Sequence, residues 1–95
     1  MISSMTQCEI SNQFFEDIAK LKQEDKKLLA KVWDLINDIR NNIHSPSTGI
    51  GKPEALRNDL SGFYSRRITD KHRLIYRVKN DIIQLVSCYG HYEDN

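Results

Sequence analysis

The stretch from Gly51 to Tyr92, GKPEALRNDLSGFYSRRITDKHRLIYRVKNDIIQLVSCYGHY, decides the fold of this chain. Apolar and polar residues alternate over residues 63–69 and 72–78, and a more apolar run follows at 82–88. A period of two is typical of half-buried β-strands, so we predict three strands here. Short polar turns separate the segments, which favours a meander of neighbouring antiparallel strands.

Basic side chains are concentrated in and beside these strands. The arginines concerned are Arg66, Arg67, Arg73 and Arg77. Guanidinium groups bind phosphate through a planar fork of donors, so we expect one sheet face to meet an anionic partner, with nucleic acid as the leading candidate. A simpler interpretation is favoured for Arg66 and Arg77, namely solvated strand positions. His72 and His44 are likewise expected at the surface or in loops.

Two amphipathic helices are predicted before the strands. Phe14, Ile18 and Leu21 recur at helical spacing within residues 12–23, and a longer apolar stripe runs through residues 25–42. A link of a few residues between them implies an antiparallel helical hairpin. Weak alternation over residues 6–11 predicts a short first strand, whereas residues 54–60 fit either a turn of helix or a short strand.

The expected order is β-α-α-β-β-β in one domain that comprises residues 1–95. This order predicts an α+β fold, in which an antiparallel twisted sheet is covered on one face by the two-helix hairpin. The other face is then free, and we expect the arginines there. The loop before the sheet, residues 44–53, contains two prolines and two glycines and brings the chain to Glu54.

Composition and charge narrow the class of protein. The chain has 95 residues, 39% hydrophobic and 28% charged, which is typical of a soluble globular protein. No apolar run approaches a membrane span and no signal-peptide pattern begins the chain, so a cytoplasmic protein is expected. The net charge is only +1, yet residues 51–79 carry eight Lys and Arg against three acids. Cys8 and Cys88 are not expected to pair, and Cys88 is expected to be a small buried hydrophobe.

The same segment contains the groups that metal-free RNA cleavage requires. A base must accept the proton of the attacking 2′-hydroxyl, an acid must protonate the leaving oxygen, and cations must stabilise the phosphoryl group. Glu54 is a candidate base and His91 a candidate acid, since imidazole titrates near neutral pH. Arg73 and Arg67 are candidate phosphate ligands. Three tyrosines are candidates for stacking on bases: Tyr64, Tyr89 and Tyr92. Nothing in the sequence is typical of a metal or cofactor site.

The exact order of residues in this segment carries further information. The string GIGKPEALRNDLSGFYSRRITDKHRLIYRV, followed by SCYGHY, closely resembles the YoeB/Txe toxins, a branch of the RelE-like superfamily with a microbial-ribonuclease-like fold. The resemblance runs nearly without gaps from Gly49 to Tyr92. It implies the toxin of a type II toxin–antitoxin system, an mRNA endoribonuclease that acts on translated mRNA at the ribosomal A site and inhibits translation.

The resemblance also implies partners and site residues. The partners would be a YefM/Axe-type antitoxin, the ribosome with its mRNA, and operator DNA through the toxin–antitoxin complex, and relatives can form homodimers. The roles implied are Glu54 as general base, Arg73 as transition-state ligand, His91 as general acid, and Arg67, Arg57, Tyr92 and Lys52 as substrate-binding residues. Arg57 stands where the family has a lysine, which keeps the charge and alters the geometry.

Two alternative functions remain open at the level of sequence. The chain could be a non-catalytic antitoxin-binding and co-repressor module, or a gyrase-poisoning toxin of the same superfamily. The presence of Glu54, Arg73 and His91 argues against both. The chain also continues beyond the His-Tyr pair with residues 93–95, whose two acids either act on His91 and the RNA or form a solvated tail.

Overall fold

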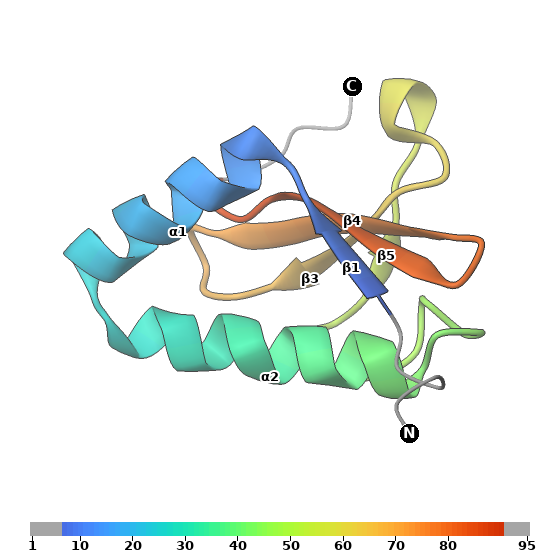
Figure 1. Cartoon of the computed structure of the whole chain (residues 1–95), viewed down its shortest axis with the longest axis horizontal. Coiled ribbons are helices and arrows are strands. Elements are labelled where there is room, and N and C mark those ends of the chain that lie inside the picture. The colour runs from blue at the N-terminus through green and yellow to red at the C-terminus, as the bar shows by residue number, and fades with distance from the viewer. Residues whose placement is uncertain (1–6, 91–95) are drawn as a thin grey trace.

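Residues 7–90 of the chain are described by the computed structural model. The elements are β1 (Gln7–Ile10), α1 (Asn12–Glu24), α2 (Lys27–Asn41), β2 (Glu54–Ala55), the 3-10 helix η1 (Asn58–Leu60), β3 (Tyr64–Arg67), β4 (Arg73–Lys79) and β5 (Ile82–Ser87) (Figure 1). The order agrees with the β-α-α-β-β-β expectation. The ambiguous segment at 54–60 contains both a two-residue strand and a short turn of helix.

The helices form because each has one apolar face and a side chain that accepts a backbone N–H near its start. Ser11 precedes α1, and its hydroxyl oxygen accepts a hydrogen bond from the backbone N–H of Phe14 at 2.9 Å. The Asp25 carboxylate accepts the N–H of Lys27 at the start of α2. The apolar stripes are buried in one core with the sheet; from the helices it contains Phe14, Leu21, Val32, Leu35, Ile36 and Ile39.

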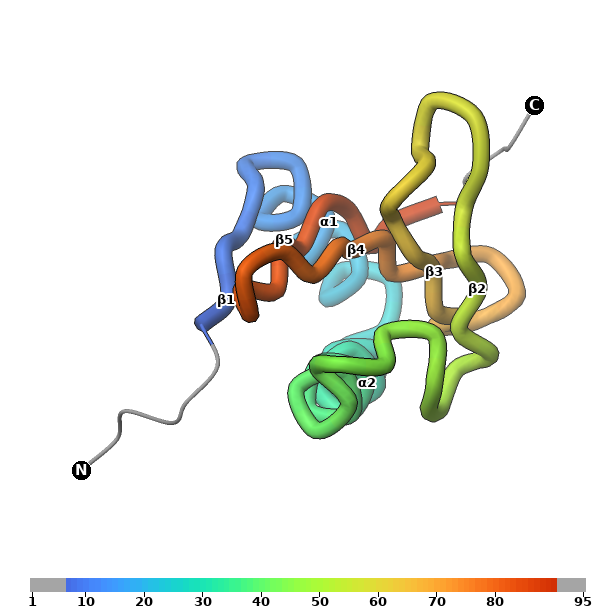
Figure 2. The backbone as a smooth tube through the Cα atoms, turned by 90° about the vertical axis from the view of Figure 1, so that its right-hand side faces the viewer, coloured from blue at the N-terminus to red at the C-terminus, as the bar shows by residue number. Residues whose placement is uncertain are grey.

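The five strands form one sheet in the order β1-β5-β4-β3-β2, and Figure 2 shows them side by side with α2 below them. The predicted α+β class with a helical hairpin is confirmed. The sheet is mixed rather than wholly antiparallel, because β1 runs parallel to β5 while the other neighbours are antiparallel. A parallel pair needs a long crossover connection, and the chain between β1 and β5 provides it.

The register of β3 and β4 separates two adjacent arginines. Arg67 lies opposite Arg73, and Arg66 lies opposite Leu74. Directly opposed residues of an antiparallel pair share a face, and successive residues of a strand alternate. Arg67 and Arg73 therefore share one face, whereas Arg66 shares the other face with Leu74, a residue of the buried core.

Arg66 is fully buried, so the expectation of a solvated strand residue is wrong. Its Nε donates to the Tyr76 hydroxyl at 3.0 Å, and one terminal nitrogen donates to Asp38 Oδ2 at 2.5 Å. The remaining donors reach the carbonyl oxygens of Ile50 and Thr48 at 3.0 and 2.8 Å. The guanidinium thus joins α2, β3, β4 and the loop before β2, and a buried charge is stable only with partners of this kind.

The backbone of the loop between α2 and β2 is hydrogen-bonded to the Arg66–Asp38 pair and to Tyr76. The Tyr76 hydroxyl donates to Pro46 O at 2.5 Å, and the Ile50 N–H donates to Asp38 Oδ2 at 3.0 Å. Gly49 has a φ of +128°, and a Cβ there would lie 1.8 Å from Asp38 Oδ2. Only glycine allows the backbone to approach the Arg66–Asp38 pair so closely.

His72 and Arg77 also differ from expectation. His72 is only 4% exposed because it lies between Glu24 of α1 and Gly90 after β5. Arg77 is half-buried, with its guanidinium carbon 4.8 Å from the centroid of the Phe63 ring and its Nε bonded to Gln84. The local sequence does not reveal these partners, because all of these contacts except Arg77–Gln84 join residues more than ten positions apart.

Cys88 is buried, which agrees with the expectation of a small buried hydrophobe. Cys8 is exposed, and both cysteines are free thiols. Burial, followed by the charge of nearby Asp17, raises the pKa of Cys88 to about 12, so this side chain remains a neutral hydrophobe. Within residues 7–90, no helix has the length and apolar character needed to cross a membrane.

Removing the Arg66 charge should destabilise the protein more than the same substitution at another arginine of the sheet. We expect Arg66→Met to lower the free energy of unfolding by about 2–4 kcal/mol, because Asp38 and Tyr76 lose a partner. The matched control, Arg77→Met, should cost about 1 kcal/mol or less. Urea denaturation measures both, and equal losses in the two variants would contradict the role given to Arg66.

Stability should depend on pH through Asp38. The hydrogen bond from Arg66 holds the pKa of Asp38 below its ordinary value, with a smaller contribution from the Ile50 N–H. A lowered folded-state pKa gives stability that is present above the unfolded value, about 4, and is lost as pH falls through the folded value. We expect the native chain to lose stability below about pH 4 more steeply than Asp38→Asn, as measured by urea denaturation from pH 7 to 3. Parallel curves would refute this.

Candidate active site

A cavity of about 330 Å³ opens on the sheet face that carries Arg67 and Arg73. Its lining residues come from the end of the α2–β2 loop and from strands β2, β3 and β4; they are Lys52, Pro53, Glu54, Ser65, Arg67 and Arg73. Three cationic side chains and one carboxylate thus surround one small polar space. This arrangement suits a ligand that carries both a phosphate and a proton to be transferred.

Glu54 is placed by strand pairing and by the turn before it. It lies opposite Ser65 in the β2–β3 pair, so the two side chains share the cavity face. The Arg67 N–H donates to Gly51 O at 2.6 Å, which ties the end of the loop to β3. Lys52 then adopts a left-handed backbone with φ of +51° before Pro53. Such a conformation is uncommon outside glycine and requires support from its surroundings.

The two arginines of the cavity are adjacent across strands β3 and β4. A terminal nitrogen of Arg73 donates to Thr69 O at 2.9 Å, which holds this side chain from the β3–β4 turn. Arg67 makes an exposed ion pair with Asp70 at 3.4 Å. Its Nε is buried and has no hydrogen-bond partner among the described residues. An unsatisfied buried donor is costly, so Arg67 is prepared to stabilise an acceptor such as a phosphate oxygen.

Four of the predicted site residues come together here: Lys52, Glu54, Arg67 and Arg73. Arg57 is exposed and does not line the cavity. His91 and Tyr92 lie outside the described residues, as do residues 93–95. Among residues 7–90, no group of three or more His, Cys, Asp or Glu side chains is arranged to hold a metal ion.

The predicted stacking tyrosines occupy other places. Tyr64 packs against Tyr76 with ring centroids 5.8 Å apart, on the core side of β3. Its alternation with Ser65 therefore points it away from the cavity. Tyr89 is exposed and packs against the His72 ring at 4.4 Å.

Comparison with known proteins identifies the family. Residues 10–92 match the family model described as YoeB-like toxin of bacterial type II toxin-antitoxin system. The chain belongs to this YoeB-like toxin family. It is 42% identical over 82 residues to Toxin YoeB of Escherichia coli strain K12, an alignment that covers 86% of this chain and 94% of the relative.

Solved structures of YoeB proteins have the same fold. The heterotetrameric YoeB–YefM complex of Staphylococcus aureus contains a chain that matches with a TM-score of 0.80 at 42% identity, covering 94% of this chain and 100% of that one. The YoeB dimer of the same organism gives a TM-score of 0.81 at 41% identity, with the same coverage. The YoeB-like toxin fold of this chain is therefore established by sequence and by shape.

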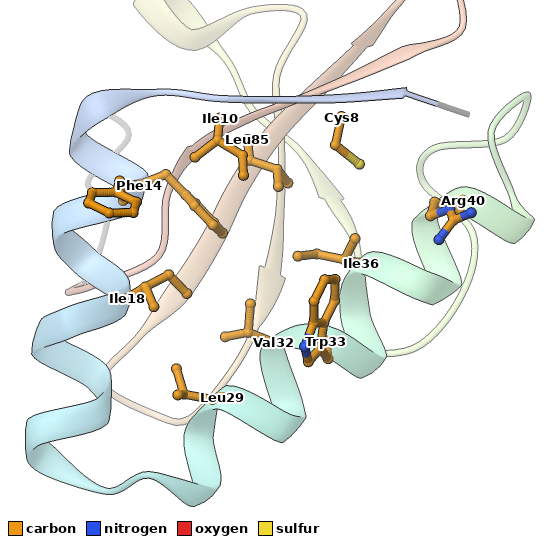
Figure 3. A pocket seen from close by; sticks show the side chains of 11 residues that line it. Cys8, Ile10, Phe14, Ile18, Leu29, Val32, Trp33, Ile36, Arg40 and Leu85 are labelled. Carbon is orange, nitrogen blue, oxygen red and sulfur yellow. The ribbon is translucent and has the colours of Figure 1, made fainter. Parts of the chain in front are cut away.

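This YoeB-like chain has a second, larger cavity between β1, α1 and α2, with a volume of about 460 Å³ (Figure 3). Its lining is apolar apart from Arg40, and it includes the exposed side chains of Ile10, Phe15 and Trp33. Without a carboxylate or a cluster of cations, this groove offers no acid–base chemistry. Exposed apolar area of this kind is typical of surfaces that proteins bury against one another.

The sequence analysis missed two cavity residues, Pro53 and Ser65, of which Ser65 lies on a strand. It is 3% exposed and lies between Tyr64 and Arg66 on β3. Alternation with Arg67 was the available signal, because residues two apart on a strand share a face. Identifying its partner Glu54 required the β2–β3 register, which pattern alone does not give.

The unsatisfied donor of Arg67 should make this side chain the principal anion ligand of the cavity. We expect inorganic phosphate to shift the Arg67 Nε–H resonance in an NMR titration and Arg67→Lys to weaken phosphate binding about 10-fold, since the fork geometry is lost. Arg77→Lys is the matched control and should leave the binding unchanged. A phosphate response that survives in Arg67→Lys would exclude this assignment.

Proposed function

We propose that this YoeB-like toxin is a ribosome-dependent mRNA endoribonuclease that cleaves translated mRNA at the A site by metal-free acid–base catalysis. The observation that carries the proposal is the cavity in which one carboxylate, Glu54, is combined with three cations. A phosphodiester needs cationic ligands and a base near the ribose, and this cavity supplies both. Membership in the YoeB-like family supports the same reaction class.

The proposed reaction assigns one task to each group. The Glu54 carboxylate accepts the proton of the ribose 2′-hydroxyl, and the oxygen attacks the adjacent phosphorus. Arg67 and Arg73 bind the non-bridging oxygens, on which negative charge increases in the transition state. The bond from phosphorus to the 5′-oxygen breaks, and His91 donates a proton to that oxygen. The products are a 2′,3′-cyclic phosphate and a free 5′-hydroxyl.

The remaining substrate contacts follow the same logic. Lys52 lines the cavity and is proposed to bind the RNA backbone, whereas Arg57 is exposed beyond it and is proposed to contact a neighbouring phosphate. Tyr92 is proposed as a further substrate ligand from the sequence resemblance. The overall charge of +1 is small for a protein that holds RNA alone, so the ribosome is proposed to present the mRNA.

Regulation is proposed to follow the family pattern. The S. aureus relative was solved in a heterotetrameric complex with YefM and separately as a dimer. We therefore propose a YefM/Axe-type antitoxin as the partner of this chain, with binding to operator DNA through the complex. A homodimer of the free toxin and action in the cytoplasm belong to the same proposal.

Primer extension on an mRNA in a purified translation system tests the reaction. We expect the native chain to cleave within the reading frame only when ribosomes are present. Glu54→Gln should lower the rate about 10²–10⁴-fold, because an amide cannot accept the proton, and His91→Ala should do the same by removing the acid. Glu16→Gln, an exposed change on α1, is the matched control and should cleave normally.

The alternatives make different predictions in the same samples. A non-catalytic antitoxin-binding module leaves the mRNA intact and leaves gyrase active. A gyrase poison leaves the mRNA intact but blocks supercoiling of plasmid DNA. Cleavage that is unaffected by Glu54→Gln would retain the nuclease and remove Glu54 as its base.

A further inference from the structure

The three residues after β5 are held by one face of α1. The Cys88 N–H donates to Asp17 Oδ2 at 2.9 Å, in a buried position. Asp17 is 2% exposed, and its other carboxylate oxygen accepts a hydrogen bond from Gln13 at 2.8 Å. A charge-assisted bond of this kind fixes the backbone at the point where the strand ends.

The next residue is held through its ring. Tyr89 packs against His72 with centroids 4.4 Å apart and an angle of 32° between the ring planes. From the helix, the Lys20 ammonium lies 5.6 Å from the centroid of the Tyr89 ring. Tyr89 therefore contacts both a buried histidine and α1, although it is itself exposed.

Gly90 is held at both of its backbone polar groups. Its N–H donates to Nδ1 of His72 at 2.8 Å, and its carbonyl accepts the N–H of Arg73 at 3.1 Å. Because Nδ1 accepts, the ring proton lies on Nε2, which is 2.7 Å from a carboxylate oxygen of Glu24. The sequence Glu24–His72–Gly90 is a continuous chain of hydrogen bonds from α1 to the end of the described structure.

The spacing on α1 explains why one helix reaches three successive residues. Asp17, Lys20 and Glu24 are three and four positions apart and so share a helix face. This α1 polar face meets Cys88, Tyr89 and Gly90 in order, the last through His72. These polar contacts therefore join α1 to three successive residues after β5.

We propose that Glu24 and His72 are positioning residues for RNA cleavage, because they fix the backbone of Gly90, the residue that precedes the proposed acid in the sequence. The inference rests on the proposed function, in which His91 is the general acid. Arg73 links the two places, since its N–H holds Gly90 and its side chain lines the cavity. Neither Glu24 nor His72 lines the cavity, so neither touches the reacting atoms.

The expected effect is on the chemical step rather than on substrate binding. A misplacement of a catalytic group by about 1 Å costs on the order of 100-fold in rate. The side chains of Arg67 and Arg73 keep their hydrogen bonds to Asp70 and to Thr69 O when the bond between Gly90 and His72 is lost. Loosening Gly90 should therefore lower kcat while KM stays nearly constant.

Two substitutions of His72 separate its two hydrogen bonds. In His72→Gln the amide nitrogen reaches the position of Nε2 and still donates to Glu24, but no acceptor faces Gly90. In His72→Asn the side-chain oxygen lies near the position of Nδ1 and still accepts from Gly90, but the contact with Glu24 is lost. Both variants remove the ring that packs against Tyr89, so that loss is common to them.

The test measures kcat and KM for ribosome-dependent mRNA cleavage and amide exchange at Gly90 by NMR. We expect His72→Gln to lower kcat about 10–100-fold, to leave KM within about 3-fold, and to speed exchange at Gly90. His72→Asn should stay within about 3-fold of native in kcat and retain protection of Gly90. His44→Gln, at an exposed loop histidine, is the control and should match the native chain.

Two results would overturn the inference: equal loss of kcat in the two His72 variants, or a loss that appears in KM alone. If both variants fail to fold, Glu24 supplies a second pair. Glu24→Gln keeps an acceptor for Nε2–H and should retain activity, whereas Glu24→Ala should lower kcat. Equal activity of that pair would likewise overturn it.

Failure of the proposed function is distinguishable from failure of this inference. Without ribosome-dependent cleavage by the native chain, the proposed nuclease and this positioning role are both wrong. With native cleavage present and His72→Gln unaffected, only the positioning role is wrong. The exchange data at Gly90 then show whether the hydrogen bond exists without a catalytic effect.

Discussion

The buried guanidinium of Arg66 is the interaction on which the rest of the structure depends. Its donors bind Asp38, the Tyr76 hydroxyl and two carbonyl oxygens of the loop before β2. A charge without such partners would be too costly to bury, so helix, strands and loop are stable only together. Lysine would not replace it, because one ammonium group lacks the planar fork that reaches acceptors in several directions. Gly49 is required for the same reason, since any side chain there would clash with Asp38.

The consequence for function comes from the residue next to Arg66. Alternation along β3 places Arg67 on the opposite face, where it lines the cavity with Glu54. Arg66 therefore binds the loop before β2 from the core face of the sheet, and Arg67 lines the cavity beside the end of that loop on the other face. The Arg67 N–H to Gly51 O bond completes this coupling, because it fixes the loop just before the proposed base. Stability of the core and geometry of the site are thus not independent.

The sequence was sufficient for the helices, the three later strands and most of the cavity, because these depend on local periodicity and on a continuous motif. It was insufficient for Arg66 and His72, which both look like surface residues in their local sequence. Their burial depends on Asp38, which is 28 positions from Arg66, and on Glu24, which is 48 positions from His72. The sequence analysis expected Arg66 on the free face, because no local pattern names the partner that makes a buried charge tolerable. The parallel β1–β5 pair escaped prediction for the same reason, since strand neighbours are a property of the whole chain.

Arg73 connects the two halves of the candidate site. Its side chain lines the cavity beside Arg67, and its backbone N–H holds the carbonyl of Gly90. The proposed base reaches the cavity through the loop that Arg66 fixes, whereas the chain toward the proposed acid is fixed by α1 through His72. Two proton-transfer groups on separate segments can act on one phosphate only if both segments share a rigid reference. The first residue of β4 provides that reference, because Arg73 lines the cavity with its side chain and holds the carbonyl of Gly90 with its backbone N–H.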